Sequence, residues 1–363
     1  MRLRSKWAVV WLALLFAGVL FFVSGCGQAA VPPPTWPGLT LAGDTLYLSA
    51  ADGRLWALDV KSSGAARWAV PAVGSKDTAA FHADAAPAGD LIIIGSSNSG
   101  ITALAAETGQ QRWNIQTGGA ILAGALVEGE TAFVVAEDKK LRAINVTNGV
   151  LQWEFTTEGR LWARPAWAAG KVYVGSLDHH LYCLDATSGR EVWRVKTEGA
   201  IAGSPTVTAG VVYIGSLDSK LYALDAATGA KKWEFKAENW MWGAATIQDD
   251  IVYVGSTDAR VYALRASDGT LVWNFTTGGL VRAAPAYRAG VLYVASRDGK
   301  VYALDAKSGQ LRWAYTVDEK GDQILSNLFV TEDAVYTVSM KGKVVALDPA
   351  GGSLRWSVTP GQK

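Results

Sequence analysis

The chain has 363 residues, half of them hydrophobic, and 34 Lys and Arg stand against 33 Asp and Glu. So even a balance excludes the basic surface on which nucleic-acid-binding proteins depend. Two cysteines, Cys26 and Cys183, are too few for a fold held together by a disulfide framework, so burial of a hydrophobic core has to stabilise it.

The first segment, residues 1–25, has the features of a secretion signal. Arg2, Arg4 and Lys6 form a basic start, and the 17 residues 7–23 that follow carry no charge. A membrane-spanning helix needs about 20 apolar residues, so an uncleaved anchor is the less favoured alternative. Removal of residues 1–25 leaves 31 basic against 33 acidic residues (34 − 3 and 33 − 0), a net charge of −2.

The end of this segment, Val23-Ser24-Gly25-Cys26, resembles the lipobox of bacterial lipoproteins. The resemblance implies that Cys26 becomes the lipid-modified first residue and anchors the protein outside the cytoplasm. The anchoring membrane would be the outer membrane, on its periplasmic face, in a Gram-negative cell, and otherwise the outer face of the cytoplasmic membrane. Residues 26–36 include three consecutive prolines, which favour an extended tether.

Tryptophans recur along the remainder of the chain, and five consecutive intervals between them are 40 residues long. The eight are Trp68, Trp113, Trp153, Trp193, Trp233, Trp273, Trp313 and Trp356. A period of about 40 residues with several short apolar strands is typical of a β-propeller. We therefore predict an all-β protein, an eight-bladed β-propeller of four-stranded antiparallel blades over residues 37–358, with a tail at 359–363.

Each repeat contains four strand signals separated by turns. In one repeat they lie at residues 204–208, 211–216, 221–225 and around 232–235, which predicts an antiparallel meander. The first strand of each repeat is richest in small residues, so we place it at the crowded ring axis.

Two recurring positions are interpreted as structural. Asp178, Asp218 and Asp258 occupy the same turn in successive repeats, as expected of a carboxylate that braces the turn. Cys183 stands where other repeats have alanine, which predicts a small buried residue.

The turn between the third and fourth strands carries the pattern Ala-x-Asp-x-x-Ser/Thr-Gly-x-x-x-Trp, as in Ala223, Asp225, Thr228, Gly229 and Trp233. This pattern resembles the tryptophan-docking motif of the pyrroloquinoline quinone (PQQ) repeat family. The resemblance implies that each indole packs between blades while the Asp and Thr brace the turn. The Asp is replaced in three repeats, which should weaken individual turns without breaking the ring; the replacements are Ala105, Asn145 and Arg265.

Eight blades, a lipobox and few inserted segments together resemble the propeller lipoproteins of the machinery that assembles outer-membrane β-barrels. That resemblance implies a noncatalytic scaffold with envelope protein partners and no cofactor. Quinoprotein alcohol dehydrogenases also have eight blades, but they resemble a larger structure with inserts and an adjacent cysteine pair, which this chain lacks.

No catalytic or metal-binding constellation is recognisable in the sequence. The three histidines are His82, His179 and His180, and the adjacent pair in a turn is a poor metal clamp because neighbouring side chains diverge. We expect these two to be solvated turn residues.

The connections from one repeat to the next are where the repeats differ most, and they line one mouth of the ring. Trp and Arg, the residues that most often anchor interfaces, gather there. The candidate binding residues are Arg160, Trp162, Arg164, Trp240, Trp242 and Arg282. The alternative is that these side chains plug the channel. Two longer connections, 71–87 and 317–323, add to the same face.

Three functions remain open at this point. The favoured one is a lipid-anchored protein-interaction scaffold, a monomer within a complex and attached to the membrane through Cys26. The others are a binder of a small ligand such as a sugar or quinone, stacked on Trp162, Trp240 and Trp242, and a PQQ-dependent dehydrogenase. How the ring is closed is also left open.

Overall fold

The computed structural model describes residues 37–74, 80–318 and 321–361, all of which belong to one compact unit. Within these residues every regular element is a β-strand, and no helix is long and apolar enough to cross a lipid bilayer. The predicted lipoprotein signal peptide, Cys26 and the tether lie outside the described residues.

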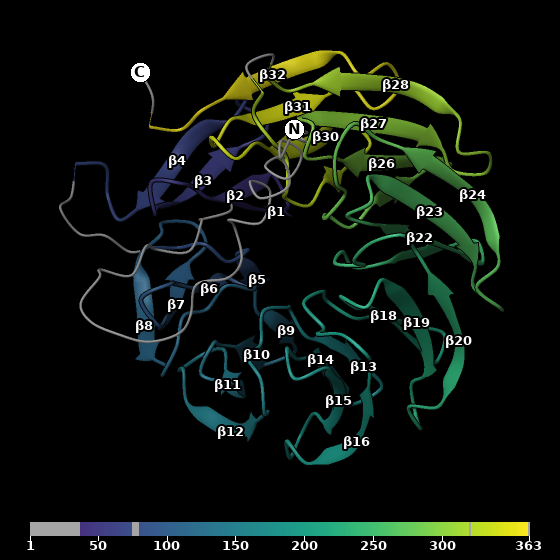
Figure 1. Ribbon diagram of the computed structural model, residues 1–363. Helices are drawn as coiled ribbons and strands as arrows, with labels where there is room; N and C mark the ends of the chain where they lie inside the picture. The colour runs from purple at the N-terminus through teal and green to yellow at the C-terminus, as the bar shows by residue number, and fades with distance from the viewer. Residues whose placement is uncertain (1–36, 75–79, 319–320, 362–363) are drawn as a thin grey trace, which may run out of the picture. The chain divides into compact units, whose positions relative to one another are not determined.

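The strands form eight sheets of four consecutive antiparallel strands, arranged as blades around a ring (Figure 1). The inner strands are β1 (Gly38–Ala42), β5 (Ala86–Ala88), β9 (Leu126–Glu128), β13 (Ala166–Ala168), β17 (Thr206–Thr208), β21 (Thr246–Gln248), β25 (Ala286–Arg288) and β29 (Phe329–Val330). The second strands are β2 (Thr45–Ser49), β6 (Leu91–Gly95), β10 (Thr131–Val135), β14 (Lys171–Gly175), β18 (Val211–Gly215), β22 (Ile251–Gly255), β26 (Val291–Ala295) and β30 (Val335–Val338).

The third strands are β3 (Leu55–Asp59), β7 (Gly100–Ala105), β11 (Lys140–Asn145), β15 (His180–Asp185), β19 (Lys220–Asp225), β23 (Arg260–Arg265), β27 (Lys300–Asp305) and β31 (Val344–Leu347). The outer strands are β4 (Ala65–Val70), β8 (Gln111–Gln116), β12 (Leu151–Thr156), β16 (Glu191–Lys196), β20 (Lys231–Lys236), β24 (Leu271–Thr276), β28 (Leu311–Thr316) and β32 (Leu354–Val358). The eight-bladed all-β prediction is thereby confirmed.

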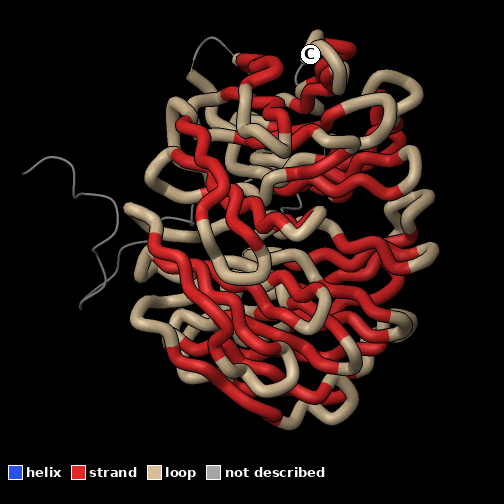
Figure 2. Tube along the Cα trace, turned by 90° about the vertical axis from the view of Figure 1, so that its right-hand side faces the viewer, coloured by secondary structure: helices blue, strands red, loops and turns tan. Residues whose placement is uncertain are grey.

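The core lies between neighbouring blades. Second and third strands are buried on both faces because a blade covers each side, whereas the outer strand β20 is mainly exposed apart from Trp233 and Phe235. The small residues that the sequence placed in the first strands do lie at the axis, but most of them, such as Gly124, Ser204 and Ala284, belong to the loops just before those strands. The inner strands surround the centre of the ring (Figure 1). Figure 2 shows the loops gathered at the two faces of the ring.

The eight recurring tryptophans connect each blade to the next. The indole Nε1 of Trp233 donates a hydrogen bond to the carbonyl oxygen of Ala266 in the following blade, at 2.9 Å. Six further pairs repeat this bond: Trp68 with Ala106, Trp113 with Val146, Trp153 with Ala186, Trp193 with Ala226, Trp273 with Ala306 and Trp313 with Pro349. The inter-blade packing that the PQQ-repeat resemblance implied is thus present.

The departures from the docking motif keep their turns. Asn145 accepts hydrogen bonds from the amides of Thr147 and Asn148 through its side-chain oxygen, as Asp225 does from Ala227 and Thr228. Where the Asp is missing, the backbone bond that closes the turn remains, at 2.9 Å from Gly269 N to Arg265 O.

The recurring turn carboxylates hold the inter-blade loops in place. Asp218 accepts hydrogen bonds from the Tyr222 hydroxyl at 2.7 Å and from the Glu198 amide at 3.0 Å. Burial, reinforced by this carboxylate, raises the pKa of the Tyr222 phenol. Asp178 is bound to Tyr182 in the same way. These carboxylates are structural, as predicted.

Cys183 and the adjacent histidines differ in how closely they match their predicted environments. Cys183 is fully buried, and burial raises the pKa of its thiol to about 11. His180 is less solvated than expected because its ring lies against Asp178, with Nδ1 at 3.2 Å from the carboxylate. Its neighbour His179 has a φ of 73° and occupies the turn.

The ring closes through side chains and not through a shared strand. Among the described strands, β1–β4 form one complete sheet and β29–β32 another. Across the seam, the indole of Trp356 lies on Gly64, where an added Cβ would come within 2.8 Å of the ring. Leu46, Leu48 and Trp56 of the first blade share a core with Tyr336 and Val344 of the last. This contact resolves the question of closure that the sequence left open.

Candidate functional site: the central channel and its mouth

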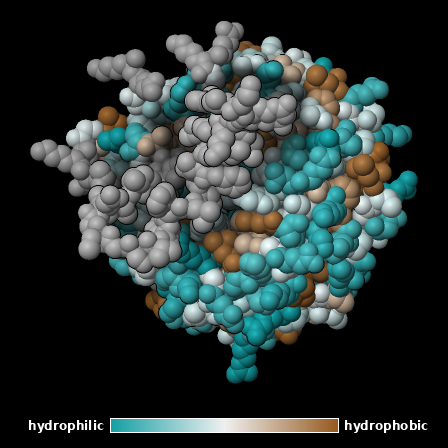
Figure 3. All heavy atoms as spheres, in the orientation of Figure 1, coloured by the Kyte–Doolittle hydropathy of each residue, from teal (hydrophilic) through white to brown (hydrophobic). Residues whose placement is uncertain are grey.

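A cavity of about 490 Å³ lies on the ring axis, lined by residues from all eight blades. Most of its lining comes from the loops that lead into the inner strands. Figure 3 shows hydrophobic side chains gathered near the centre of the ring on the face drawn, within a mainly hydrophilic border.

Each of these loops approaches its inner strand as an extended chain whose side chains alternate in environment. We number positions backwards from the first residue of the inner strand, so that Arg164 is at position −2 and Leu161 at position −5. Along residues 160–163 the side chains are exposed, buried, half-buried and buried in turn. Alternation of this kind follows from extended backbone, in which successive side chains point to opposite sides.

Position −5 holds a large apolar side chain that packs between the blades. Leu161, Ile201, Met241 and Val281 are at most 1% exposed. Ile201 lies so close to Gly175 of the preceding blade that an added Cβ there would come within 2.2 Å of it. The side chains that plug the space between blades are therefore these apolar residues, which sequence reasoning did not single out.

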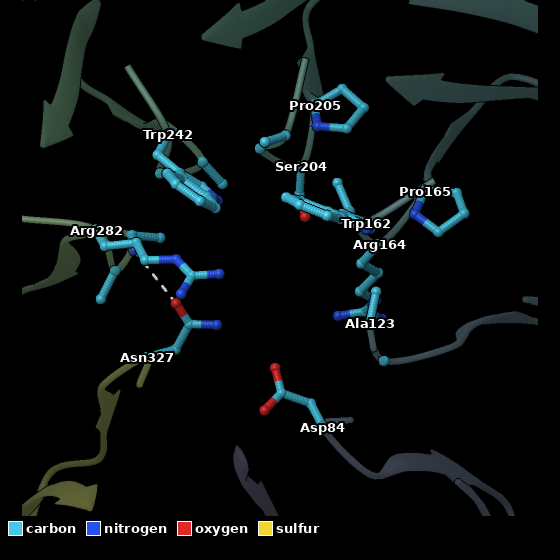
Figure 4. Close-up of a pocket in the computed structure, with 18 of the residues that line it drawn as sticks. Asp84, Ala123, Trp162, Arg164, Pro165, Ser204, Pro205, Trp242, Arg282 and Asn327 are labelled. Carbon is cyan, nitrogen blue, oxygen red and sulfur yellow. Dashed lines mark hydrogen bonds between the residues drawn. The ribbon is translucent and has the colours of Figure 1, made fainter. Parts of the chain in front are cut away.

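Positions −4 and −2 face the cavity. Position −4 is occupied by His82, Leu122, Trp162, Ala202, Trp242, Arg282 and Leu325. Position −2 is occupied by Asp84, Gly124, Arg164, Ser204, Ala244, Ala284 and Asn327. Four of the six candidate binding residues, Trp162, Arg164, Trp242 and Arg282, are thus brought together around one cavity, and the cavity remains open between them (Figure 4).

The other two candidates, Arg160 and Trp240, occupy position −6 on the outer rim of the same mouth. The Arg160 side chain is 50% exposed and lies 3.7 Å from the Glu137 carboxylate. Trp240 is 40% exposed, whereas the Trp242 side chain two residues later is half-buried. We call Arg160 and Trp240 the rim and the side chains at positions −4 and −2 the channel wall.

The aromatic residues of the channel wall are held in place by polar partners. The guanidinium carbon of Arg282 lies 4.4 Å from the centre of the Trp242 ring, a cation–π contact. The indole Nε1 of Trp162 donates a hydrogen bond to Glu137 Oε1 at 3.1 Å. On the far side of Arg282, Asn327 accepts a hydrogen bond from the Ala284 amide at 3.2 Å.

Partial desolvation shifts the pKa values of the charged groups of the channel wall. Desolvation lowers the pKa of Arg282 to about 10 and also lowers the pKa of Arg164, against the opposing attraction of Asp84. Desolvation raises the pKa of Asp84 to about 6, although Arg164 and a hydrogen bond from the Leu39 amide favour its charged form. Burial likewise lowers the pKa of His82.

Asp84 and Asn327 were missed by sequence reasoning, yet the sequence carries a signal for both. Asp84 precedes Trp113 by 29 residues, Arg164 precedes Trp193 by 29, and Asn327 precedes Trp356 by 29. Counting back from the docking tryptophans places all three at position −2. The longer connections 71–87 and 317–323 obscure this register when the count starts from the preceding repeat.

The described residues offer no cluster of metal ligands. Across residues 37–74, 80–318 and 321–361, no three His, Cys, Asp or Glu side chains come together in a group that could hold a metal ion.

These features define the class of the protein as a closed β-propeller of PQQ-like repeats with indole docking between blades. The family model described as outer membrane protein assembly factor BamB matches residues 23–120, 63–164, 157–241 and 236–362. Since these matches span most of the chain, the protein belongs to that family.

Solved structures show the same fold. The crystal structure of BamB from Moraxella catarrhalis is 23% identical, with a TM-score of 0.72 over 85% of this chain and 94% of that one. The computationally designed protein Ika8 is 15% identical, with a TM-score of 0.76 over 88% of this chain and 98% of that one. No curated protein matches the sequence. At these identities the likeness to solved structures shows the fold alone.

Proposed function

We propose that this protein is a noncatalytic, lipid-anchored scaffold of the cell envelope that takes part in outer-membrane protein assembly. Membership of the BamB family supports this role. Cys26, preceded by a lipobox, would carry the anchor, and residues 37–358 would form the soluble docking body. The partner is an envelope protein of the assembly machinery, and neither a cofactor nor nucleic acid takes part.

The observation that carries the proposal is the exposed rim. The indole of Trp240 is 40% exposed, whereas the eight docking tryptophans are half-buried or buried. Trp240 is held at its backbone, because its carbonyl accepts a hydrogen bond from the Thr257 amide at 3.0 Å, so a partner would meet a positioned side chain. Trp and Arg give most of the binding free energy at many interfaces because they bury a large area with polar groups attached.

The rim can be tested by cross-linking in native envelopes. We expect the double variant Trp240→Ala, Arg160→Ala to recover at least about tenfold less of an outer-membrane assembly component than the unchanged protein, because two anchor side chains are lost. The matched control is Leu271→Ala on outer strand β24, which removes an apolar side chain of similar exposure away from the mouth. Equal recovery from both variants would contradict docking at the rim.

Variants of the channel-wall tryptophans distinguish binding of a partner from filling of the channel. If Trp162 and Trp242 only fill space, replacing both with Ala lowers the thermal unfolding midpoint strongly and leaves partner recovery unchanged. If they bind the partner, recovery of the partner falls in this double variant, whereas Leu271→Ala on outer strand β24 retains it.

Lipidation of Cys26 can be tested against a matched control, because the chain contains only one other cysteine, Cys183. Cells fed a labelled fatty acid should incorporate label into the protein and into Cys183→Ser, but not into Cys26→Ser. Label retained in Cys26→Ser would refute lipidation at that residue.

A further inference from the structure

The charged groups that face the cavity are unequal in number. Among the described residues that line it, Arg164 and Arg282 are the cations and Asp84 is the anion. Figure 4 shows the two guanidiniums reaching into the central space from opposite walls, with the Asp84 carboxylate entering below them. With His82 neutral, the channel wall therefore carries a net positive charge.

One of the two cations, Arg282, is held where water solvates it poorly, whereas Arg164 is exposed at the cavity surface. Arg282 is stacked on Trp242 and its guanidinium is desolvated. A desolvated cation gains more from an added anion than an exposed one, because the attraction is less screened. A guanidinium also has the planar, forked donor geometry that matches a carboxylate.

The rest of the lining is mixed in character. The apolar residues Ala123, Pro165, Pro205 and Leu325 lie beside polar ones, namely Ser204, Thr206, Ser326 and Asn327. The indoles of Trp162 and Trp242 add flat surfaces that suit an aromatic ring. A volume of about 490 Å³ lies within the range of small-molecule sites.

We propose that the channel is a binding site for a small aromatic carboxylate. Its carboxylate lies between the guanidiniums of Arg164 and Arg282, and its ring packs against the indoles of Trp162 and Trp242. This site goes beyond the scaffold role and is independent of it, because the purified chain alone is sufficient for binding.

The test uses full-length protein in detergent micelles, labelled with 5-fluorotryptophan and titrated with benzoate. Fluorine NMR resolves individual tryptophans, and the variants Trp162→Phe and Trp242→Phe assign the two channel resonances. We expect millimolar benzoate to shift these two and to leave the docking tryptophans, such as Trp233, unmoved. Benzamide, with the same ring and no charge, should bind at least about tenfold more weakly, and glucose should not compete. Inorganic phosphate, which has the charge but no ring, should compete only at concentrations at least about tenfold above those of benzoate.

Three variants locate the carboxylate. Arg164→Gln and Arg282→Gln should each weaken benzoate binding by about tenfold or more, whereas Arg190→Gln, an exposed arginine outside the cavity, should not change it. Asp84→Asn should tighten binding at pH 7.5 because it removes the one negative charge of the wall. A gain in affinity cannot arise from a poorly folded variant, so this variant keeps the test decisive.

Several results would overturn the proposal. They are no shift of either channel resonance, equal binding of benzoate and benzamide, unchanged affinity in both arginine variants, or weaker binding in Asp84→Asn.

Discussion

Asp84 shows how one side chain in the channel can oppose folding at neutral pH. Its carboxyl lies among protein groups at the axis, and desolvation raises its pKa from an ordinary 3.8 to about 6. A carboxyl with a raised pKa in the folded state binds its proton more tightly there than in the unfolded chain. Its contribution to stability is therefore complete below pH 3.8 and is lost as the pH rises through about 6.

Asp84→Asn should consequently stabilise the protein above pH 7, by up to about 3 kcal/mol if the full shift applies. The gain should shrink as the pH falls and vanish below about pH 4, where wild-type Asp84 is protonated in both states. Urea unfolding of both proteins from pH 4 to 8 measures the difference. A variant less stable than wild type at pH 8 would mean that the attraction of Arg164 outweighs the desolvation of Asp84.

At the scale of the element, the turn between third and outer strands joins two blades through a glycine. Gly229 has a φ of +75°, and an added Cβ would lie 2.9 Å from the indole of Trp193. Gly210, in the turn between inner and second strands, has almost the same φ of +74° but nothing within 4 Å of an added Cβ. Substitutions at Gly210 and Gly229 therefore distinguish the cost of backbone strain from the cost of displacing the docked indole.

Gly210→Ala should cost about 1 kcal/mol, the usual strain of an L-residue in the left-handed region. Gly229→Ala should cost about 1–3 kcal/mol more, because Trp193 has to move out of its packed position. Thermal unfolding of the two variants measures this difference directly. Equal destabilisation would show that the indole adjusts freely and that the glycine serves only the turn.

The elements themselves were accessible from the sequence because their signals are local. Alternating apolar residues and turn residues specify each strand and hairpin within one repeat, as in residues 211–225. The loop positions that build the channel depend instead on how a loop crosses to the next blade. The sequence therefore indicated that Trp162 and Trp242 lie at the mouth. It did not indicate that the residues just before them, Leu161 and Met241, pack between the blades.

The whole ring has one weak place, where the first and last blades meet. Every other neighbouring pair is joined by a covalent loop, but this seam is held by side chains such as Trp356 on Gly64. Figure 1 shows the two blades side by side. Local opening of the protein should therefore begin there.

Trp356→Ala and Trp233→Ala each remove one docking indole and should each lower the free energy of unfolding by about 3–5 kcal/mol. Their local effects should differ. Hydrogen exchange in Trp356→Ala should accelerate across β1–β4 and β29–β32 together, since only side-chain packing and no connecting loop joins these sheets. In Trp233→Ala the loop between β20 and β21 keeps the blades adjacent, so exchange should rise less. Equal patterns in the two variants would contradict a weak seam.

The sequence alone determined the number of blades, the four-stranded meander and the docking role of the tryptophans, because the same local pattern of strands, turns and tryptophan occurs in eight repeats. It also identified Trp162, Arg164, Trp242 and Arg282 as residues of one mouth. Only the tertiary structure decided that these four surround an open cavity, that Asp84 faces the two guanidiniums, and that Arg160 and Trp240 lie apart on the rim. Those relations join residues of different blades across the axis, and their geometry is set by ring closure, which no single repeat encodes.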